Sequence, residues 1–289
     1  MLPEWLAIRP ASTEKYASIK GSINRLGLHT VCVEAKCPNM SECWSGGTAT
    51  FMVLGDMCTR GCTFCAVSKM AKGAAVDVKE PEKLAALVKE WGLGYIVVTS
   101  VCRDDLADQG SSHFARCVTE IKKENPNTFV EVLIPDFGND DKCLRRIADS
   151  HPDVIGHNIE TVERLSSSVR DRRANYRQSL EVLGKFKEMD SSIYTKSAMM
   201  LGIGEREDEV AAALRDLRSS GVDFIAMGQY LRPPGHHLAV ADYIRPEVFD
   251  RYRDIAISMG FKYAASGPFV RSSYKAGEYF ISSIVRSRS

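Results

Sequence analysis

From about residue 48 to residue 270 the chain alternates between two hydrophobic patterns. Runs of apolar and β-branched residues indicate strands at seven places: residues 48–55, 95–100, 129–135, 154–160, 193–202, 224–231 and 262–269. Between these runs, apolar residues recur every three or four positions, which is typical of amphipathic helices. The clearest of these stripes begin at Leu84, Phe114, Val210 and Val248. Strands that alternate with helices predict a parallel sheet built from βαβ units.

Six strand–helix units can curve into a full or partial barrel, and the catalytic residues of such a barrel lie at the carboxyl ends of its strands. Polar residues with possible chemical roles follow four of the predicted strands: Cys58–Cys65, Asn158 with Glu160, Gly202–Glu205 and Gln229. We therefore predict an α/β domain over residues 48–270. An N-terminal extension (1–47) and a C-terminal extension (271–289) lie outside the repeat.

The composition narrows the class of protein. The chain has 289 residues, of which 44% are hydrophobic and 26% charged, so it can form a sizeable core. Its net charge of +1 gives no electrostatic reason to expect nucleic acid or an anionic membrane as a partner. The first ten residues lack the apolar core of a signal peptide, and no apolar run reaches the roughly 18 residues that a membrane helix needs. These features predict a soluble cytoplasmic protein.

Nine cysteines add a stronger signal. The odd number and the lack of an export signal argue against a disulfide framework. Six of the nine lie between Cys32 and Cys65, where an even distribution would place about one, so we expect them to bind metal. Cys117 and Cys143 occupy apolar positions and are predicted core residues, and Cys102 is predicted to be structural.

Three of these cysteines, Cys58, Cys62 and Cys65, fall within eight residues. A structural zinc site uses four protein ligands, whereas three thiolates on one tight loop suit three irons of a [4Fe–4S] cluster. The fourth iron would then be open to a substrate or cofactor. The alternative is that the three pack as small core residues, which the intervening Arg60 and Gly61 disfavour.

A second set has the spacing Cys32-x4-Cys37-x5-Cys43. It again offers three thiolates and no obvious fourth ligand. A zinc ion completed by a ligand from elsewhere in the chain is an open alternative to a second cluster.

The motif Cys-x3-Cys-x2-Cys with an aromatic residue, Phe64, before its last cysteine resembles the signature of the radical S-adenosylmethionine (SAM) enzymes. With the second cysteine set and "RSSY" at residues 271–274, the chain resembles the lipoyl synthases. Other segments that resemble this family are "EAKCPNMSECW", "VTSVCRDDLADQG", "GHNIETV", "MGQYLRP" and "GPFVRSSYKAG". Cys102 departs from the resemblance, because an acidic residue is expected before "RDD".

The resemblance implies a partial (β/α)6 TIM-type barrel, two [4Fe–4S] clusters and SAM. The open iron at Cys58, Cys62 and Cys65 would bind the amino and carboxylate groups of SAM, whose cleavage yields a 5′-deoxyadenosyl radical. Such a radical is needed because acid–base groups cannot activate an ordinary C–H bond. The enzyme would insert sulfur at carbons 6 and 8 of an octanoyl group on a lipoyl carrier, an E2 domain or the glycine-cleavage H protein. Ferredoxin or flavodoxin would supply electrons.

The resemblance also implies roles for single residues. Phe64, Ala66 and Ile203 would contact the adenine of SAM. Asn158 and Glu160 would bind its ribose hydroxyls, although they could simply end a strand.

Two further residues resemble family positions. Lys196 would meet the SAM carboxylate, or it is a surface lysine. Ser272 would be the fourth ligand of the auxiliary cluster at Cys32, Cys37 and Cys43, with Ser273 as the reserve. The alternative is a C-terminal turn in which both serines cap backbone groups.

Two other functions are compatible with iron–sulfur motifs. A different sulfur-inserting radical enzyme, such as a biotin synthase or a methylthiotransferase, would lack the second cysteine set together with "RSSY". An iron–sulfur electron carrier would need fully ligated clusters and no large barrel, which the seven predicted strands disfavour.

Overall fold

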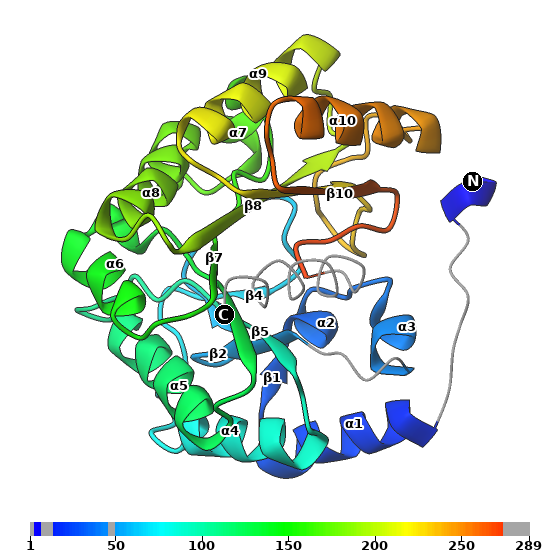
Figure 1. Ribbon diagram of the computed structural model, residues 1–289. Coiled ribbons are helices and arrows are strands. Elements are labelled where there is room, and N and C mark those ends of the chain that lie inside the picture. The colour runs from blue at the N-terminus through cyan, green and yellow to red at the C-terminus, as the bar shows by residue number, and fades with distance from the viewer. Residues whose placement is uncertain (1–2, 7–13, 46–49, 274–289) are drawn as a thin grey trace. The chain divides into compact units, whose positions relative to one another are not determined.

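The computed structural model describes residues 3–6, 14–45 and 50–273 (Figure 1). The chain divides into two compact units. The N-terminal unit consists of Arg9–Arg60 and Val67–Ile155, and the C-terminal unit consists of Met1–Ile8, Gly61–Ala66 and Gly156–Ser289. The predicted C-terminal extension lies outside the described residues from position 274 onward.

The N-terminal unit contains a four-stranded sheet in the order β1-β2-β5-β6. Its strands and helices are α1 (Glu14–Leu26), β1 (His29–Thr30), α2 (Val31–Glu34), α3 (Met40–Ser45), β2 (Thr50–Val53), β3 (Met57–Cys58), β4 (Ser68–Lys69), α4 (Glu80–Trp91), β5 (Tyr95–Ser100), α5 (Ser111–Glu124), β6 (Phe129–Leu133), η2 (Phe137–Asn139) and α6 (Asp141–Ala148). β2 pairs in parallel with β5, and β5 with β6. The strand β7 (Val154–Gly156) begins beside β6, where the Asp153 amide donates to the Val130 carbonyl.

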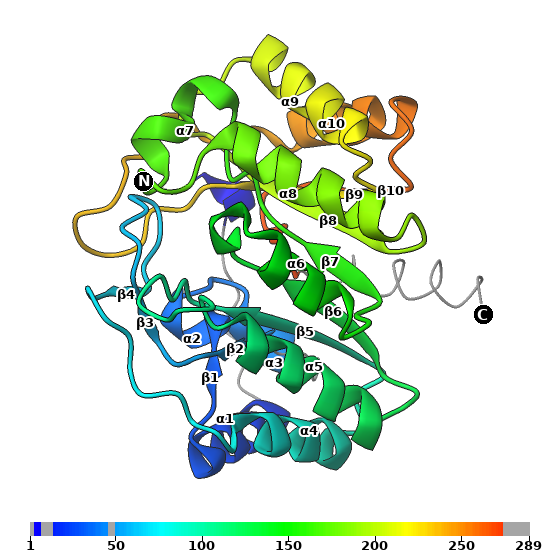
Figure 2. The same cartoon turned by 90° about the vertical axis from the view of Figure 1, so that its left-hand side faces the viewer.

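The predicted helical stripes form the core of this unit. Leu84, Leu87 and Val88 of α4 are fully buried, as are Phe114 and Cys117 of α5. The two helices lie side by side in Figures 1 and 2. Cys143 is also buried, so the predicted core roles of Cys117 and Cys143 are confirmed.

Residues 14–45 fold into elements that the strand–helix repeat did not predict. The two-residue strand β1 pairs antiparallel with β2, with His29 opposite Met52. The helix α2 is capped by Thr30, whose hydroxyl accepts a hydrogen bond from the Val33 amide. These contacts join the segment with the upstream cysteines to the first strand of the repeat.

The C-terminal unit contains three parallel strands in the order β8-β9-β10. Its elements are η1 (Glu4–Leu6), α7 (Glu163–Val169), α8 (Tyr176–Met189), β8 (Tyr194–Leu201), α9 (Glu207–Ser219), β9 (Phe224–Gln229), α10 (Pro246–Ser258) and β10 (Tyr263–Gly267). All six residues of β9 are buried, as expected for a parallel strand that is covered on both faces. In Figure 2, α8 runs along β8, and α9 lies beside α10.

All seven predicted strands occur, and their parallel pairing within each unit confirms the α/β class. The fourth strand is shorter than predicted, because residues 157–160 do not continue β7. The Ile159 amide donates to the Ser197 hydroxyl instead of to a strand carbonyl. Glu160 forms only an isolated bridge with Met199 and has a φ of 67°, which an extended strand cannot contain.

Candidate active site

In the N-terminal unit, Cys58 lies on β3, just after the first buried strand. Its carbonyl accepts a hydrogen bond from the Met70 amide at 3.0 Å, and β3 pairs with β4 so that Cys58 is opposite Lys69. The pairing of β3 with β4 brings together the two chain segments that flank Gly61–Ala66. The residues before and after the loop that carries Cys62 and Cys65 are therefore hydrogen-bonded to each other.

The Cys58 sulfur lies where a thiolate is stabilised. Its pKa is lowered to about 6, mainly by a hydrogen bond with the Cys102 side chain and in part by the Arg60 amide, 3.4 Å from the sulfur. The same contact and burial hold the pKa of Cys102 well above its ordinary value, so Cys102 remains the protonated donor. Iron is bound by thiolate rather than thiol, so Cys58 fits the role of cluster ligand.

Cys102 was predicted to be only structural, and its contact with Cys58 was missed. The signal available in the sequence was its position directly after β5, at the catalytic end of a parallel strand.

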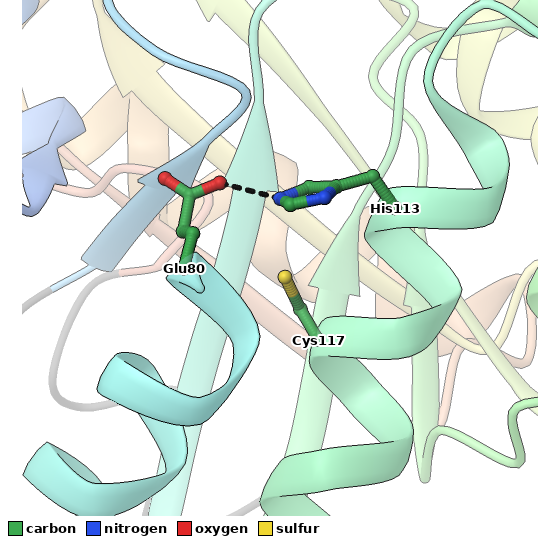
Figure 3. Close-up of side chains that lie close together, drawn as sticks. All are labelled: Glu80, His113 and Cys117. Atoms are coloured by element: carbon green, nitrogen blue, oxygen red, sulfur yellow. Dashed lines mark hydrogen bonds and ion pairs between the residues drawn. The ribbon is translucent and has the colours of Figure 1, made fainter. Parts of the chain in front are cut away.

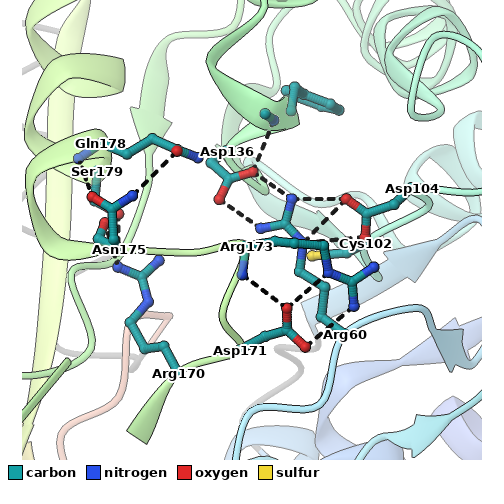
Figure 4. Close-up of polar contacts among 12 residues, drawn as sticks. Arg60, Cys102, Asp104, Asp136, Arg170, Asp171, Arg173, Asn175, Gln178 and Ser179 are labelled. Carbon is teal, nitrogen blue, oxygen red and sulfur yellow. Dashed lines mark hydrogen bonds and ion pairs between the residues drawn. The ribbon is translucent and has the colours of Figure 1, made fainter. Parts of the chain in front are cut away.

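Arg60, two residues after Cys58, forms ion pairs with two carboxylates in the N-terminal unit (Figure 4). Its guanidinium contacts Asp104 at 2.9 Å and Asp136 at 2.5 Å. Although burial favours the neutral form, these two carboxylates hold the Arg60 pKa well above its ordinary value. Thr59 adds a hydrogen bond from its hydroxyl to Asp104 at 2.6 Å.

These contacts bring together the segments that follow β2, β5 and β6. Removing one partner of a buried ion pair typically costs about 3–5 kcal/mol. Arg60 and its two carboxylates therefore hold the backbone beside Cys58 in one position.

In the C-terminal unit, Cys62 accepts a hydrogen bond from the Asp171 amide, 3.3 Å from its sulfur. The Asp171 carboxylate accepts one from the Gly61 amide at 2.7 Å, and its pKa is held below the ordinary range mainly by Arg173 (Figure 4). The Thr63 amide donates to the Val169 carbonyl at 2.9 Å. Amide hydrogen bonds to sulfur are typical support for cluster ligands, so Cys62 also fits.

Two of the predicted adenine contacts lie in one apolar cluster of the C-terminal unit. Phe64 packs against buried Val169, Ile203 and Tyr230. Ala66 is half-buried on the same loop. An apolar surface next to the cysteine loop suits an aromatic base, and contact with adenine remains a prediction for these residues.

Asn158 and Ser272 are brought into contact, which was not predicted. The Asn158 amide nitrogen donates to the Ser272 hydroxyl at 2.9 Å, and this hydroxyl lies 3.2 Å from the Asn158 carbonyl oxygen. Asn158 also donates to Glu160 at 3.1 Å. Burial raises the pKa of Glu160.

Lys196 is not a surface lysine, because it is only 5% exposed. It lies on β8 five residues before Leu201, at roughly 3.3 Å per residue, and so well before the carboxyl end of the strand. A role toward the SAM carboxylate remains a prediction.

The upstream cysteines lie in the helix–turn–helix formed by α2 and α3 in the N-terminal unit. The Cys37 amide donates to the Cys32 carbonyl at 3.0 Å, and the Cys43 amide to the Asn39 carbonyl at 2.9 Å. No disulfide joins cysteines within the described part of the chain. Three thiols on so short a segment offer three ligands to a cluster, and an auxiliary cluster at these residues remains a prediction.

A third group, Glu80, His113 and Cys117, has the residue types of a metal site (Figure 3). We interpret it as structural. One Glu80 oxygen already accepts hydrogen bonds from His113 at 2.7 Å and from the Leu54 amide at 3.0 Å. Burial raises the pKa of the Cys117 thiol well above its ordinary value, which disfavours the thiolate that a metal needs. The Glu80–His113 pair instead holds Leu54 in place through the hydrogen bond from the Leu54 amide. Leu54 has a φ of 69° and turns the chain after β2.

Comparison with known proteins decides the family. Residues 52–217 match the model of the Radical SAM superfamily. The chain is 51% identical to lipoyl synthase 1, mitochondrial, of Drosophila yakuba, over 99% of this chain and 77% of that protein. The chain belongs to the lipoyl synthase family. It is also 51% identical to the apicoplast lipoyl synthase of Plasmodium yoelii yoelii, but there it spans 98% of its own length and 56% of the relative.

The fold is that of radical SAM enzymes. The [FeFe]-hydrogenase maturase HydG of Carboxydothermus hydrogenoformans has a TM-score of 0.56 at 14% identity, covering 80% of this chain and 65% of that one. The prediction of a partial TIM-type barrel is confirmed.

As a lipoyl synthase the protein is an enzyme. It inserts two sulfur atoms, at carbons 6 and 8 of a protein-bound octanoyl group, to form the lipoyl cofactor. It uses SAM and a [4Fe–4S] cluster, and its substrate is a lipoyl-carrier protein.

The predicted cytoplasmic location is wrong. The relatives from Drosophila yakuba and Vitis vinifera are mitochondrial, and that from Plasmodium yoelii yoelii is apicoplast. The prediction failed because the features on which it rested, no secretory signal core in the first ten residues and no apolar run long enough for a membrane helix, do not distinguish the cytoplasm from the interior of an organelle. Within the described residues, no helix is both long and apolar enough to cross a membrane.

Proposed function

We propose that the enzyme uses two [4Fe–4S] clusters, each held by one of the cysteine sets. Cys58, Cys62 and Cys65 would hold the cluster that binds SAM and, when loaded, supplies the electron for SAM cleavage. Cys32, Cys37 and Cys43 would hold an auxiliary cluster that supplies sulfur. The observation that carries this proposal is the pair of amide hydrogen bonds to the Cys58 and Cys62 sulfurs, which favour bound thiolate over packed thiol. The auxiliary set is proposed from the spacing of its three cysteines.

The surrounding residues would act by binding and orientation. Arg60, with Asp104 and Asp136, would hold Cys58 in place. Phe64 and Ile203 would exclude water from the adenine side of SAM. Asn158 and Glu160 would hold its ribose hydroxyls.

Ser272 would complete the auxiliary cluster, with Ser273 in reserve. A hydroxyl oxygen is a harder ligand than thiolate, so this iron would be the most easily released. The side chain of Ser272 bonds the Asn158 side chain and not a backbone group, which argues against a capping turn. The domain scheme of residues 1–47, 48–270 and 271–289 is part of this proposal.

The proposal also specifies the carrier protein and the electron donor. The carrier would be an E2 lipoyl domain or the glycine-cleavage H protein. A small reductant, ferredoxin or flavodoxin, would reduce the SAM cluster.

Iron analysis tests the two-cluster proposal. Anaerobically reconstituted protein should contain about eight irons per chain, and the triple variant of Cys58, Cys62 and Cys65 to alanine about four. Mössbauer spectra should assign the remaining iron to a [4Fe–4S] cluster. If the triple variant binds no iron, the auxiliary cluster does not exist; if it binds a single zinc, the zinc alternative is correct.

The position of Ser272 depends on a close backbone approach. Gly228 of β9 lies so near the Val270 carbonyl that a Cβ at position 228 would penetrate it. Substitution Gly228→Ala should therefore displace the segment before Ser272, leaving SAM cleavage within about twofold and lowering lipoyl formation at least ~10-fold. Both products can be quantified by mass spectrometry.

The matched control is Gly184→Ala in α8, where a Cβ meets nothing within 4 Å. It should leave both products unchanged, because alanine is favourable in a helix. Equal lipoyl formation in Gly228→Ala and Gly184→Ala would contradict the proposed role of the Ser272 segment.

A further inference from the structure

Three side chains of metal-ligating type lie together in the N-terminal unit, and none of them belongs to a cysteine set: His29, Glu34 and Asp56. Each offers one ligand atom, and these atoms lie within 4.8 Å of one another. His29 is on β1, Glu34 is the last residue of α2, and Asp56 lies between β2 and β3. Because β1 pairs with β2, separate elements bring the three side chains to one edge of the sheet.

The ligand atoms of this group are available to a metal ion. The His29 Nδ1 atom is 3.7 Å from the Glu34 carboxylate, which is too far for a hydrogen bond. Within the described part of the chain, the Asp56 side chain forms no hydrogen bond, and no lysine or arginine forms an ion pair with Glu34 or Asp56. The group at Glu80 differs, because its carboxylate oxygen already accepts two hydrogen bonds.

The charges of this group favour a cation. The carboxylate oxygens of Glu34 and Asp56 lie within 4.8 Å of each other, so their negative charges repel. A divalent cation between them removes this repulsion, and the His29 imidazole adds a third ligand. Ligand atoms at about 2.0–2.2 Å from a metal lie about 3 Å apart, so the side chains need to move by only about 1–2 Å. The side chains of His29 and Glu34 are 35% and 24% exposed, which leaves them room for this movement.

We propose that His29, Glu34 and Asp56 bind one divalent ion of a first-row transition metal. One imidazole and two carboxylates favour Mn²⁺ or Fe²⁺, whereas softer metal ions favour thiolate ligands. The bound ion connects the end of α2, two residues after Cys32, with the segment that leads from β2 to Cys58. The site needs neither of the [4Fe–4S] clusters, so its test is independent of the two-cluster proposal.

The probe is Mn²⁺, a hard ion that prefers oxygen and nitrogen ligands to thiolate. Holoenzyme freed of loosely bound iron is titrated with manganese chloride, and the electron paramagnetic resonance signal of hydrated Mn²⁺ measures the unbound ion. We expect one bound Mn²⁺ per chain, with a nitrogen coupling from one imidazole in its pulsed spectrum. His29→Ala should remove this coupling and weaken binding at least ~10-fold, because even the loss of a group behind a metal ligand costs about 10–100-fold.

Glu42→Gln in α3 is the matched control, because it removes an exposed carboxylate from the same unit and no proposed ligand. It should leave the Kd for Mn²⁺ within about twofold, because salt screens an exposed charge. Asp56→Asn is the second test variant and decides the matter if His29→Ala does not fold. It keeps the shape of the side chain, removes one ligand charge and should weaken binding at least ~10-fold. Circular dichroism and iron content are measured on the same samples.

Weaker binding in His29→Ala and Asp56→Asn, with Glu42→Gln unchanged, supports the site. The proposal is overturned if the holoenzyme binds no Mn²⁺ at millimolar concentration, or if the folded test variants bind it as tightly as the parent protein. Bound Mn²⁺ without a nitrogen coupling also overturns it, because the ion then lies elsewhere. Binding that depends on His29 in protein without auxiliary iron supports the site and contradicts only the two-cluster proposal.

Discussion

Replacing Cys58 with alanine should abolish the cleavage of SAM. The rate of 5′-deoxyadenosine formation is expected to fall at least ~10³-fold, a loss of more than ~4 kcal/mol in transition-state stabilisation. Alanine cannot supply the thiolate, and the Arg60 amide and the Cys102 thiol lose the sulfur that they contact. Chromatographic assay of 5′-deoxyadenosine after incubation with SAM and dithionite measures this directly.

Cys143→Ala is the matched control for this substitution. Cys143 is buried on α6, and its sulfur lies 3.4 Å from the Asp108 carbonyl oxygen. The substitution Cys143→Ala should lower the free energy of unfolding slightly and leave the iron content and the rate of SAM cleavage unchanged. Undiminished 5′-deoxyadenosine from Cys58→Ala would show that the motif does not hold the SAM cluster, and it would favour the core-packing alternative. The same assay also excludes a simple electron carrier, which would form no 5′-deoxyadenosine.

The hydrophobic pattern predicted the fold well because parallel strands covered on both faces are almost continuously apolar. β9 is the clearest example, with every residue buried. The same pattern could not find β1, since two residues are too short to show a period, and its pairing depends on β2. It also could not predict the end of β7, where the Ser197 side chain takes the place of a strand carbonyl.

The cysteines of the site could be predicted because their spacing along the sequence is itself the signal. Their partners could not be predicted in this way. Arg60 meets Asp136, 76 residues away in sequence, only after the strands have paired. The contact of Asn158 with Ser272 spans 114 residues, and no local pattern encodes it.

Replacing Cys37 with alanine should stop sulfur insertion while SAM cleavage continues. Cys37 lies in the turn between α2 and α3 and is half-buried, so its removal disturbs the core less than removal of buried Cys32. SAM cleavage should remain within about threefold, whereas lipoyl formation should fall at least ~10³-fold, because the auxiliary cluster supplies sulfur and not the radical. Mass spectrometry of an octanoylated carrier peptide should then show neither one nor two added sulfur atoms.

Lys36→Gly is the matched control, because it alters the same turn without removing a thiol. Lys36 has a φ of 51°, a conformation that suits glycine, so the turn should persist and both sulfur atoms should still be inserted. Sulfur insertion by Cys37→Ala at the rate of Lys36→Gly would mean that the sulfur donor lies elsewhere in the enzyme. Loss of 5′-deoxyadenosine together with the lipoyl product would instead mean that the two cysteine sets do not act separately. Only the loss of sulfur insertion with cleavage retained agrees with an auxiliary cluster that supplies the sulfur and is held by these thiolates.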